Sequence, residues 1–161
     1  MSDRIELNKN LINLHEKGST FEEVLSHGID ILIENGFASE EYRSQVINRE
    51  KETPTALQFE NITVSLAHGD PIGVISSAMV ILRCDNKPEF GLMDNPSKFV
   101  PVDLVVLLGI NNPNSHIKVL AKLINALSDE NICNVIKTSD DVEKIYTILE
   151  NELLKEDNAN E

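Results

Sequence analysis

The chain has 161 residues, with 27 acidic against 14 basic side chains and a formal net charge of −13, a length that fits one domain with a proper hydrophobic core. The acidic excess argues against nucleic acid or an anionic membrane surface as a partner, because both repel a negative protein. The first residues lack the apolar core of a signal peptide, and no run approaches the roughly 18–20 apolar residues of a membrane span, so we expect a cytoplasmic protein without direct membrane insertion.

The first third of the chain predicts two helices after a polar lead. Residues 1–18 are weakly patterned and predict an irregular or short helical segment. Ser19 or Thr20, with a glutamate three residues on, is typical of a capping box, so a helix begins there and ends at Asn35-Gly36. A second helix is expected over residues 39–51. The inward residues expected on the two helices are Val24, Leu25, Ile29, Leu32, Ile33, Tyr42, Val46 and Ile47.

Strands are predicted near residues 56–59, 62–67, 74–82 and 102–110, because these segments are β-branched and apolar. The unbroken apolar run of residues 104–108 indicates a strand that is buried on both faces. Such a strand needs helices on each side of its sheet.

The last third predicts helices again. Residues 111–115 indicate a turn and a helix cap, followed by a helix from His116 whose core stripe is Ile117, Leu120, Ile124 and Leu127. Further helices are expected near residues 129–136 and 140–154. The fold class is therefore an α/β single-domain sandwich with a mixed central sheet, formed by residues 19–154 and followed by an acidic tail at 155–161.

His68 is the strongest candidate for chemistry. The alternating apolar run of residues 62–67 ends at this histidine, and Gly69-Asp70-Pro71 then stops the strand. A histidine at the end of a strand is positioned by the sheet and open to partners. Imidazole can carry a phosphoryl group or shuttle a proton near neutral pH.

Several segments together resemble one known family. These are Arg49-Glu50, the turn of residues 53–57, the strand of residues 64–68, the segment of residues 89–96 and the strand-to-helix segment of residues 104–123. Their order and spacing are similar to the type 2 enzyme IIA components of the bacterial sugar phosphotransferase system, with the fructose/mannitol-type fold. Residues 89–96, followed by Val102-Asp103-Leu104-Val105, resemble the galactitol-like branch in particular.

The resemblance implies a phosphoryl carrier without a cofactor. The phosphocarrier protein HPr would phosphorylate His68, and the phosphoryl group would pass to a cysteine of a IIB component for uptake of galactitol or a related sugar or polyol. Docking is expected at an apolar rim ringed by carboxylates. The chain departs from the family at Ala67, where proline is usual, and at Ala56, where glycine is usual. These changes bear on backbone geometry beside the histidine.

Four further residues are candidates for the site. His116 can donate to the phosphoryl group if its strand lies beside that of His68, and Arg49 can pair with phosphate oxygens in a forked geometry. Thr55 is a candidate hydroxyl donor. Asp70 is a candidate for orienting the His68 ring, although a backbone carbonyl would serve as well and a turn role is simpler.

Two alternatives use the same fold: a regulatory domain that signals through His68, and a catalytically silent interaction domain. A metal hydrolase using His68, His116 and Asp70 has poor support, because no HxH or HExxH pattern frames them. We expect no metal site. His15 and His27 are assigned no role, and His27 is expected at the surface. The cysteines Cys84 and Cys133 are expected to pack as small apolar residues.

Overall fold

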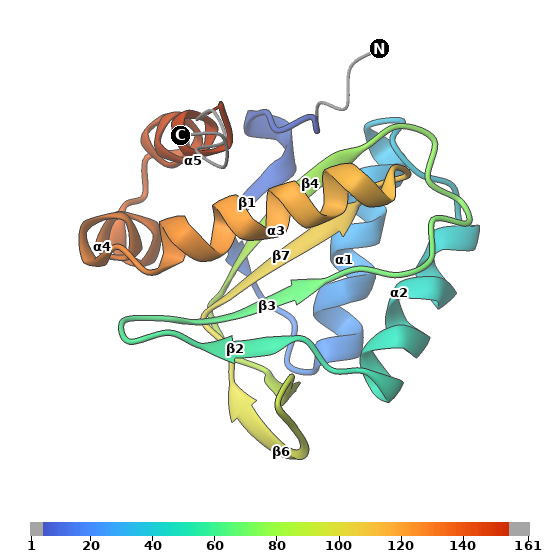
Figure 1. Ribbon diagram of the computed structural model, residues 1–161, viewed down its shortest axis with the longest axis horizontal. Coiled ribbons are helices and arrows are strands. Elements are labelled where there is room, and N and C mark those ends of the chain that lie inside the picture. The colour runs from blue at the N-terminus through green and yellow to red at the C-terminus, as the bar shows by residue number, and fades with distance from the viewer. Residues whose placement is uncertain (1–4, 155–161) are drawn as a thin grey trace.

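A seven-stranded mixed sheet runs through the computed structural model, which describes residues 5–154 (Figure 1). The strand order is β1-β4-β7-β3-β2-β5-β6. The strands are β1 (Ile12–Glu16), β2 (Ala56–Gln58), β3 (Thr63–Ala67), β4 (Ala78–Cys84), β5 (Glu89–Leu92), β6 (Asn95–Pro101) and β7 (Leu104–Gly109). The helices are η1 (Lys9–Leu11, a short 3-10 helix), α1 (Phe21–Glu34), α2 (Glu41–Glu52), α3 (Pro113–Leu127), α4 (Glu130–Thr138) and α5 (Val142–Leu154).

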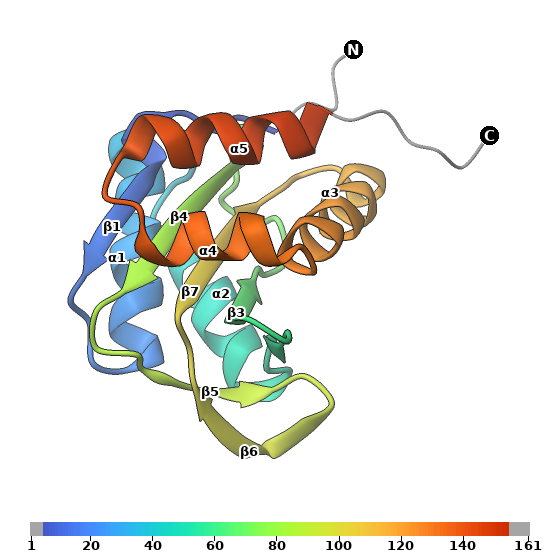
Figure 2. The same ribbon diagram turned by 90° about the vertical axis from the view of Figure 1, so that its left-hand side faces the viewer.

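Strands β4, β7 and β3 follow one another in the interior of the sheet. Every residue of β7 is buried, which confirms the strand predicted to be covered on both faces. Helices α1 and α2 cover one face, and α3, α4 and α5 lie on the other (Figures 1 and 2). The predicted α/β sandwich with a mixed sheet is therefore confirmed. No described helix has the length and apolar character needed to cross a membrane.

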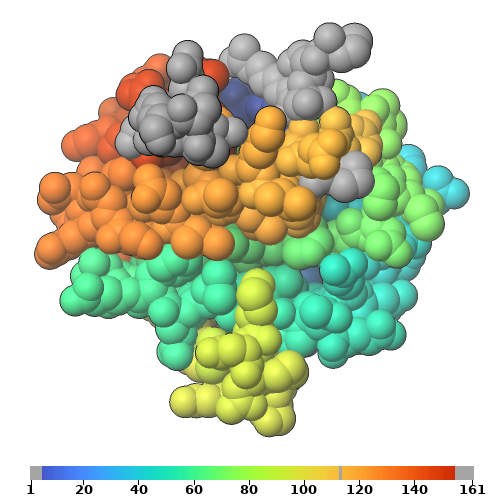
Figure 3. Space-filling view, in the orientation of Figure 1, coloured from blue at the N-terminus to red at the C-terminus, as the bar shows by residue number. Residues whose placement is uncertain are grey.

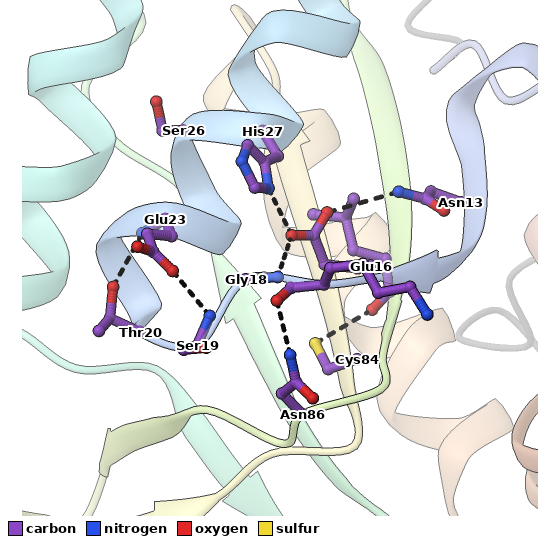
Figure 4. Close-up of polar contacts among 12 residues, drawn as sticks. Asn13, Glu16, Gly18, Ser19, Thr20, Glu23, Ser26, His27, Cys84 and Asn86 are labelled. Atoms are coloured by element: carbon purple, nitrogen blue, oxygen red, sulfur yellow. Dashed lines mark hydrogen bonds and ion pairs between the residues drawn. The ribbon is translucent and has the colours of Figure 1, made fainter.

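Helix α1 begins and ends where its sequence predicts. The Thr20 side chain accepts a hydrogen bond from the Glu23 amide, and the Glu23 carboxylate accepts one from the amide of Ser19, one residue before the cap (Figure 4). This is a variant of the predicted capping box. Gly36 takes a positive φ of 83° directly after the helix, in the conformation that glycine adopts without cost. The inward positions Val24, Leu25, Ile29 and Leu32 are buried.

The prediction of an irregular or helical lead is wrong for residues 12–16, which form the edge strand β1. Ile12 pairs with Ile81 of β4 in parallel, and Leu14 is 5% exposed. The third inward position is Glu16, a carboxylate that is 1% exposed. A charge at an inward position hides the two-residue apolar period by which a strand is recognised. The predicted acidic tail at 155–161 lies outside the described residues.

Two further strand predictions need correction. Strand β4 begins at Ala78, because residues 74–77 instead form a loop that starts after Gly73 at φ 95°. Strands β5 and β6 were not predicted as strands. They form an antiparallel hairpin at the edge of the sheet, which stands out from the body in the lower part of Figure 3. Six of the seven β6 residues are exposed, and the first five of them follow one another, so β6 lacks the alternation of a half-buried strand.

The predicted core stripe of α3 is wrong at two positions. Ile117 and Ile124 are 68% and 41% exposed, whereas Leu123, Ala126 and Leu127 are each 1% exposed. The helix carries apolar residues on more than one face, so its periodicity alone does not identify the face that packs. Its start also lies earlier than expected, with Asn112 as the cap and Pro113 as the first helical residue.

Candidate functional site

The site forms where two parallel neighbouring strands end at the same edge of the sheet. Ala67 of β3 pairs with Leu107 of β7, and His68 follows β3 directly. The chain leaves β7 at Gly109 and enters α3 at Pro113, which brings His116 into the first turn of the helix. The rings of His68 and His116 are 4.5 Å apart between centroids and are inclined at 70°. The prediction for His116 requires that the strand before its helix lie beside the strand of His68, and the pairing of β3 with β7 meets this requirement.

The His68 ring is oriented by the backbone. Its Nδ1 lies 3.0 Å from the carbonyl oxygen of Leu66, and a carbonyl can only accept, so Nδ1 carries the proton and donates. The other ring nitrogen, Nε2, is then unprotonated in the neutral ring. Burial lowers the pKa of His68, and the nearby Arg49 cation lowers it further against the opposing effect of the Leu66 carbonyl. His68 is therefore held as a neutral imidazole with a lone pair on Nε2.

His116 is also held neutral. Burial lowers its pKa first, followed by the closeness of His68 and of Arg49. Its backbone amide donates to the carbonyl of Asn112 at 3.1 Å, as expected for the first turn of a helix. A neutral imidazole retains one N–H and can donate a hydrogen bond to an anion without adding a charge.

Arg49 and Asp70 lie together beside the histidines. The Arg49 Nη1 is 3.6 Å from the Asp70 Oδ1, and both side chains reach solvent. Arg49 comes from the last turn of α2, and its charge acts on both histidines. The structure therefore brings together the predicted trio of His68, His116 and Arg49. Asp70 contacts Arg49, whereas the Leu66 carbonyl, a backbone group that would serve as well as Asp70, contacts Nδ1 of the His68 ring.

Tyr42 fixes the loop that follows His68, a contact that the sequence did not predict. Its hydroxyl donates to the Leu108 carbonyl at 2.6 Å and accepts from the Gly69 amide at 3.1 Å. Burial raises the pKa of Tyr42 to about 12, so the hydroxyl keeps its proton. A side chain at Gly69 would approach the Gln45 backbone to 2.8 Å, so only glycine fits against α2.

A network of buried polar side chains lies beside the end of the sheet that carries His68. The Glu50 carboxyl contacts the Thr55 amide at 2.9 Å and the Thr55 hydroxyl at 2.8 Å, and that hydroxyl lies 2.7 Å from the Ser65 hydroxyl. Burial raises the pKa of Glu50 to about 7. Thr55 is 2% exposed with both partners in place, which leaves its hydroxyl no open side toward a phosphoryl group. Its observed contacts join α2 to β2 and β3.

The remaining histidines lie outside the site. His15 is exposed, 3.8 Å from Asp85. His27 is half-exposed, as expected of a surface residue, but its Nδ1 contacts the buried Glu16 carboxylate at 2.5 Å (Figure 4). The Gly18 amide donates to the same carboxylate. Among the described residues no group of three or more histidine, cysteine or acidic side chains could hold a metal ion.

Apolar side chains are exposed on the two segments that carry the histidines. Ile72 and Ile75, in the loop after His68, are 54% and 62% exposed, and Ile117 follows His116 directly. Exposed apolar side chains that gather near reactive groups are typical of protein contact sites. They are candidates for the apolar rim expected around His68, and both that rim and its surrounding ring of carboxylates stay predictions.

The chain matches a family model over most of its length. The model describes the phosphoenolpyruvate-dependent sugar phosphotransferase system, EIIA 2, and it matches residues 6–152. The galactitol-specific EIIA component of Escherichia coli is 31% identical over 116 residues, which are 72% of this chain and 77% of that protein. The mannitol-specific EIICBA component of the same species is 27% identical over 141 residues, or 86% of this chain and 21% of that longer protein.

Solved structures agree with this match. The mannitol enzyme IIA of Escherichia coli, in a complex with phosphorylated mannitol enzyme IIB, superposes with a TM-score of 0.76 at 26% identity. The superposition covers 92% of this chain and 99% of that one. A crystal structure of mannitol IIA from the same species gives a TM-score of 0.74 at 27% identity, with 90% and 99% of the two chains covered.

Proposed function

This chain belongs to the EIIA type 2 family of the phosphoenolpyruvate-dependent sugar phosphotransferase system, and we propose that it carries the phosphoryl group on Nε2 of His68. Members of this family are phosphoryl carriers, so the open question is which atom of this chain serves. The single observation that supports His68 is its ring orientation. Nδ1–H is committed to the Leu66 carbonyl, and Nε2 is the nitrogen left with a lone pair.

The transfer step needs no proton movement. The Nε2 lone pair attacks the phosphorus of a donor phosphohistidine in line, and a new N–P bond forms as the donor N–P bond breaks. The electron pair of the broken bond returns to the donor ring, which leaves as a neutral imidazole because its other nitrogen keeps a proton throughout the transfer. The Nδ1–H to Leu66 bond stays in place throughout and fixes the ring for attack. A cysteine thiolate of the acceptor then attacks phosphorus, and the pair returns to Nε2 of His68.

Arg49 and His116 stabilise the phosphoryl group in this scheme. Charge spreads over its equatorial oxygens during transfer, and donors that are already in place lower the barrier. His116 lies 4.5 Å from His68 between ring centroids and supplies a neutral N–H. The Arg49 guanidinium supplies a positive charge, and its loose 3.6 Å contact with Asp70 can exchange for phosphate oxygens.

HPr as donor and a IIB component as acceptor are the partners that this function requires, and both act in the cytoplasm. A relative is solved in a complex with phosphorylated enzyme IIB, and the relative of 31% identity is galactitol-specific. We assign this chain to uptake of galactitol or a related polyol on that basis. The exposed Ile72, Ile75 and Ile117 are the contact residues we expect to be shared by both partners.

The two departures from the family pattern are compatible with this role. Ala67 is fully buried in β3 and pairs with Leu107, so the β3–β7 ladder positions His68 without a proline. Ala56 pairs with Ser65 in β2, and it is not among the described residues with positive φ. An ordinary strand conformation does not require glycine.

The test is intact-mass spectrometry after the purified chain is mixed with phosphoenolpyruvate, enzyme I and HPr. We expect one acid-labile phosphoryl adduct on the parent protein and none on His68→Ala. His27→Ala is the matched control, because it removes a half-exposed histidine outside the site and should keep the adduct. His116→Ala and Arg49→Gln should keep the phosphoryl acceptor but slow transfer by roughly 100- to 1000-fold, the range for loss of one charge-stabilising donor.

The possible outcomes of this experiment distinguish a phosphoryl carrier from a catalytically silent interaction domain. An adduct that persists in His68→Ala would place the acceptor elsewhere and refute the assignment. No adduct on the parent protein, with HPr shown to be phosphorylated, would make the chain a silent IIA-like interaction domain. Ala67→Pro would then be the first reversion to test, since it restores the residue usual in the family.

A further inference from the structure

The Tyr42 hydroxyl takes the place of a backbone hydrogen bond at the end of the β3–β7 ladder. Ala67 and Leu107 form the last register pair of these parallel strands. One step further, the Gly69 amide would donate directly to the Leu108 carbonyl, because alternate residues of a strand bond to the same neighbour. The hydroxyl lies between these two groups instead, donating to the carbonyl at 2.6 Å and accepting from the amide at 3.1 Å.

The inserted oxygen holds two backbones apart. A direct bond would bring the Gly69 nitrogen to about 2.9–3.0 Å from the Leu108 oxygen, whereas here two hydrogen bonds in series connect them. The separation occurs where the two chains diverge toward the site. His68 directly precedes Gly69, and the chain beyond Leu108 leads into the first turn of α3, which carries His116.

Tyr42 is itself firmly held. Its side chain is fully buried on α2, the helix whose last turn carries Arg49. The charges of Arg49 and Asp70 both act on the hydroxyl, which places it beside the candidate site. Burial keeps the hydroxyl protonated by raising the pKa of Tyr42 to about 12, so it can donate and accept at the same time. One oxygen atom therefore joins α2, β7 and the loop after β3, and each of these segments leads to one residue of the trio His68, His116 and Arg49.

We propose that Tyr42 is a positioning residue whose hydroxyl acts as a spacer and sets the separation of the His68 and His116 rings. These rings lie 4.5 Å apart between centroids and are inclined at 70°. Tyr42 acts through Gly69 and Leu108 and not by contact with the phosphoryl group. The consequence for transfer rests on the proposed role of His68: acceptor and donor must both meet the phosphoryl group in the correct geometry, and rates are sensitive to displacements of about 1 Å.

A purely stabilising role of this hydroxyl makes different predictions. Its loss would then lower the free energy of unfolding, and the molecules that stay folded would transfer at the parent rate. A spacer instead changes the histidine pair within the folded protein. The rate at saturating partner and the NMR signals of the imidazoles distinguish the two roles, because neither depends on how stable the folded state is while it is fully populated.

Tyr42→Phe is the test, since it removes the oxygen and keeps the ring that fills the core. We expect the single-turnover rate at saturating phosphorylated HPr to fall by up to roughly 100-fold, the cost of about 1 Å of misplacement. The HPr concentration that gives half of this rate should stay as in the parent, because Tyr42 is buried and offers no contact surface. The imidazole C–H signals of His68 and His116 should move, whereas those of His15 and His27 should not. Circular dichroism and urea unfolding check that the variant is folded under assay conditions.

Tyr146→Phe is the matched control, because it makes the same change at the other tyrosine of the chain, partly buried on α5. Its transfer rate and its His68 and His116 signals should match the parent. The proposal is overturned if Tyr42→Phe transfers at the parent rate at saturating HPr, or if its His68 and His116 signals do not move. A parent protein that accepts no phosphoryl group would refute the carrier role itself, and the NMR comparison would then decide the spacer by itself.

Discussion

Burial and a few neighbouring charges set the protonation states of individual side chains in this protein. His68, His116 and Glu50 are all shifted toward the neutral form, the two histidines by lowered pKa values and the glutamate by a raised one. Desolvation is the first cause in each case, because a partly dry site disfavours any ionised group. A neutral imidazole is the form that can act as a phosphoryl acceptor.

The titration of His68 can be measured directly. We expect its protonation midpoint, followed by NMR of the imidazole nitrogens, to lie below the ordinary value of 6.5, because burial and Arg49 both lower its pKa. The rate of phosphoryl acceptance should consequently stay level as pH falls through 6.5 and decline only at lower pH. Arg49→Gln removes the neighbouring cation and should raise the midpoint. A midpoint at or above 6.5 in the parent protein would contradict the described environment.

Glu50 predicts a pH-dependent stability. The folded protein keeps this carboxyl neutral up to about pH 7, whereas the unfolded chain ionises it near the ordinary value of 4.5. Between these values the folded state binds the extra proton, so the free energy of unfolding falls as pH rises from about 4.5 to about 7 and is level above. Glu50→Gln cannot ionise. It should match the parent near pH 4.5 and exceed it by up to about 3 kcal/mol at pH 8.

Urea unfolding at several pH values checks this expectation. Glu52→Gln is the control, because it lies on the same helix α2 but is exposed. Its free energy of unfolding should stay close to that of the parent, because surface substitutions are usually nearly neutral. A Glu50→Gln protein that is less stable than the parent at pH 8 would show that the carboxyl is ionised and well paired in the folded state.

Single side chains join neighbouring elements of this fold by donating hydrogen bonds to their backbone carbonyls. The Arg83 guanidinium, on β4, donates to the Leu14 carbonyl of β1 and to the Ile136 and Ser139 carbonyls at the end of α4. The Ile136 and Ser139 carbonyls lie at the C-terminal end of α4, where no further helical amide follows to pair with them. One side chain therefore connects the edge strand, the central sheet and α4.

Arg83→Gln should lower the free energy of unfolding by about 2–4 kcal/mol, because a shorter neutral side chain leaves several partly buried carbonyls unpaired. Chemical denaturation measures the loss. Hydrogen exchange should rise first at the end of α4 and along β1. Lys98→Gln removes the same charge from an exposed position on β6 and should be close to neutral. Equal stability of the two variants would mean that the Arg83 contacts contribute nothing in solution.

The whole molecule carries a large negative charge around a small open site. The net charge of −13 creates a field that attracts a partner with a basic contact face and steers the encounter. We expect the exposed apolar side chains Ile72, Ile75 and Ile117 to provide a small contact area from which a partner dissociates quickly. A carrier must capture and release two partners in turn, which favours a small interface over a tight one.

Salt should therefore slow transfer to this chain. Raising ionic strength from about 0.01 M to about 0.15 M shortens the screening length from about 30 Å to about 8 Å. We expect the second-order rate of phosphoryl transfer from HPr to fall severalfold over that range, measured by rapid quench. The single-turnover rate at saturating partner should change little, because chemistry within the complex is screened less. A second-order rate that is insensitive to salt would rule out electrostatic steering.

The sequence by itself determined the elements whose apolar period is regular and whose ends carry cap and turn residues. These include α1 with its capping box, α2, and the strands around His68 and residues 104–108, and hence the α/β class. It also identified His68 as a strand-end histidine. Local periodicity records which side of an element is apolar, and that information resides in neighbouring residues.

Only the tertiary structure decided which elements meet. The parallel pairing of β3 with β7 puts His116 beside His68, and no local pattern encodes a pairing between distant segments. The inward carboxyls Glu16 and Glu50 interrupt the apolar pattern, so β1 and the network at Thr55 were not predicted. The outward Ile117 shows the converse: burial depends on the whole packed assembly, and an apolar residue left at the surface becomes available for partners.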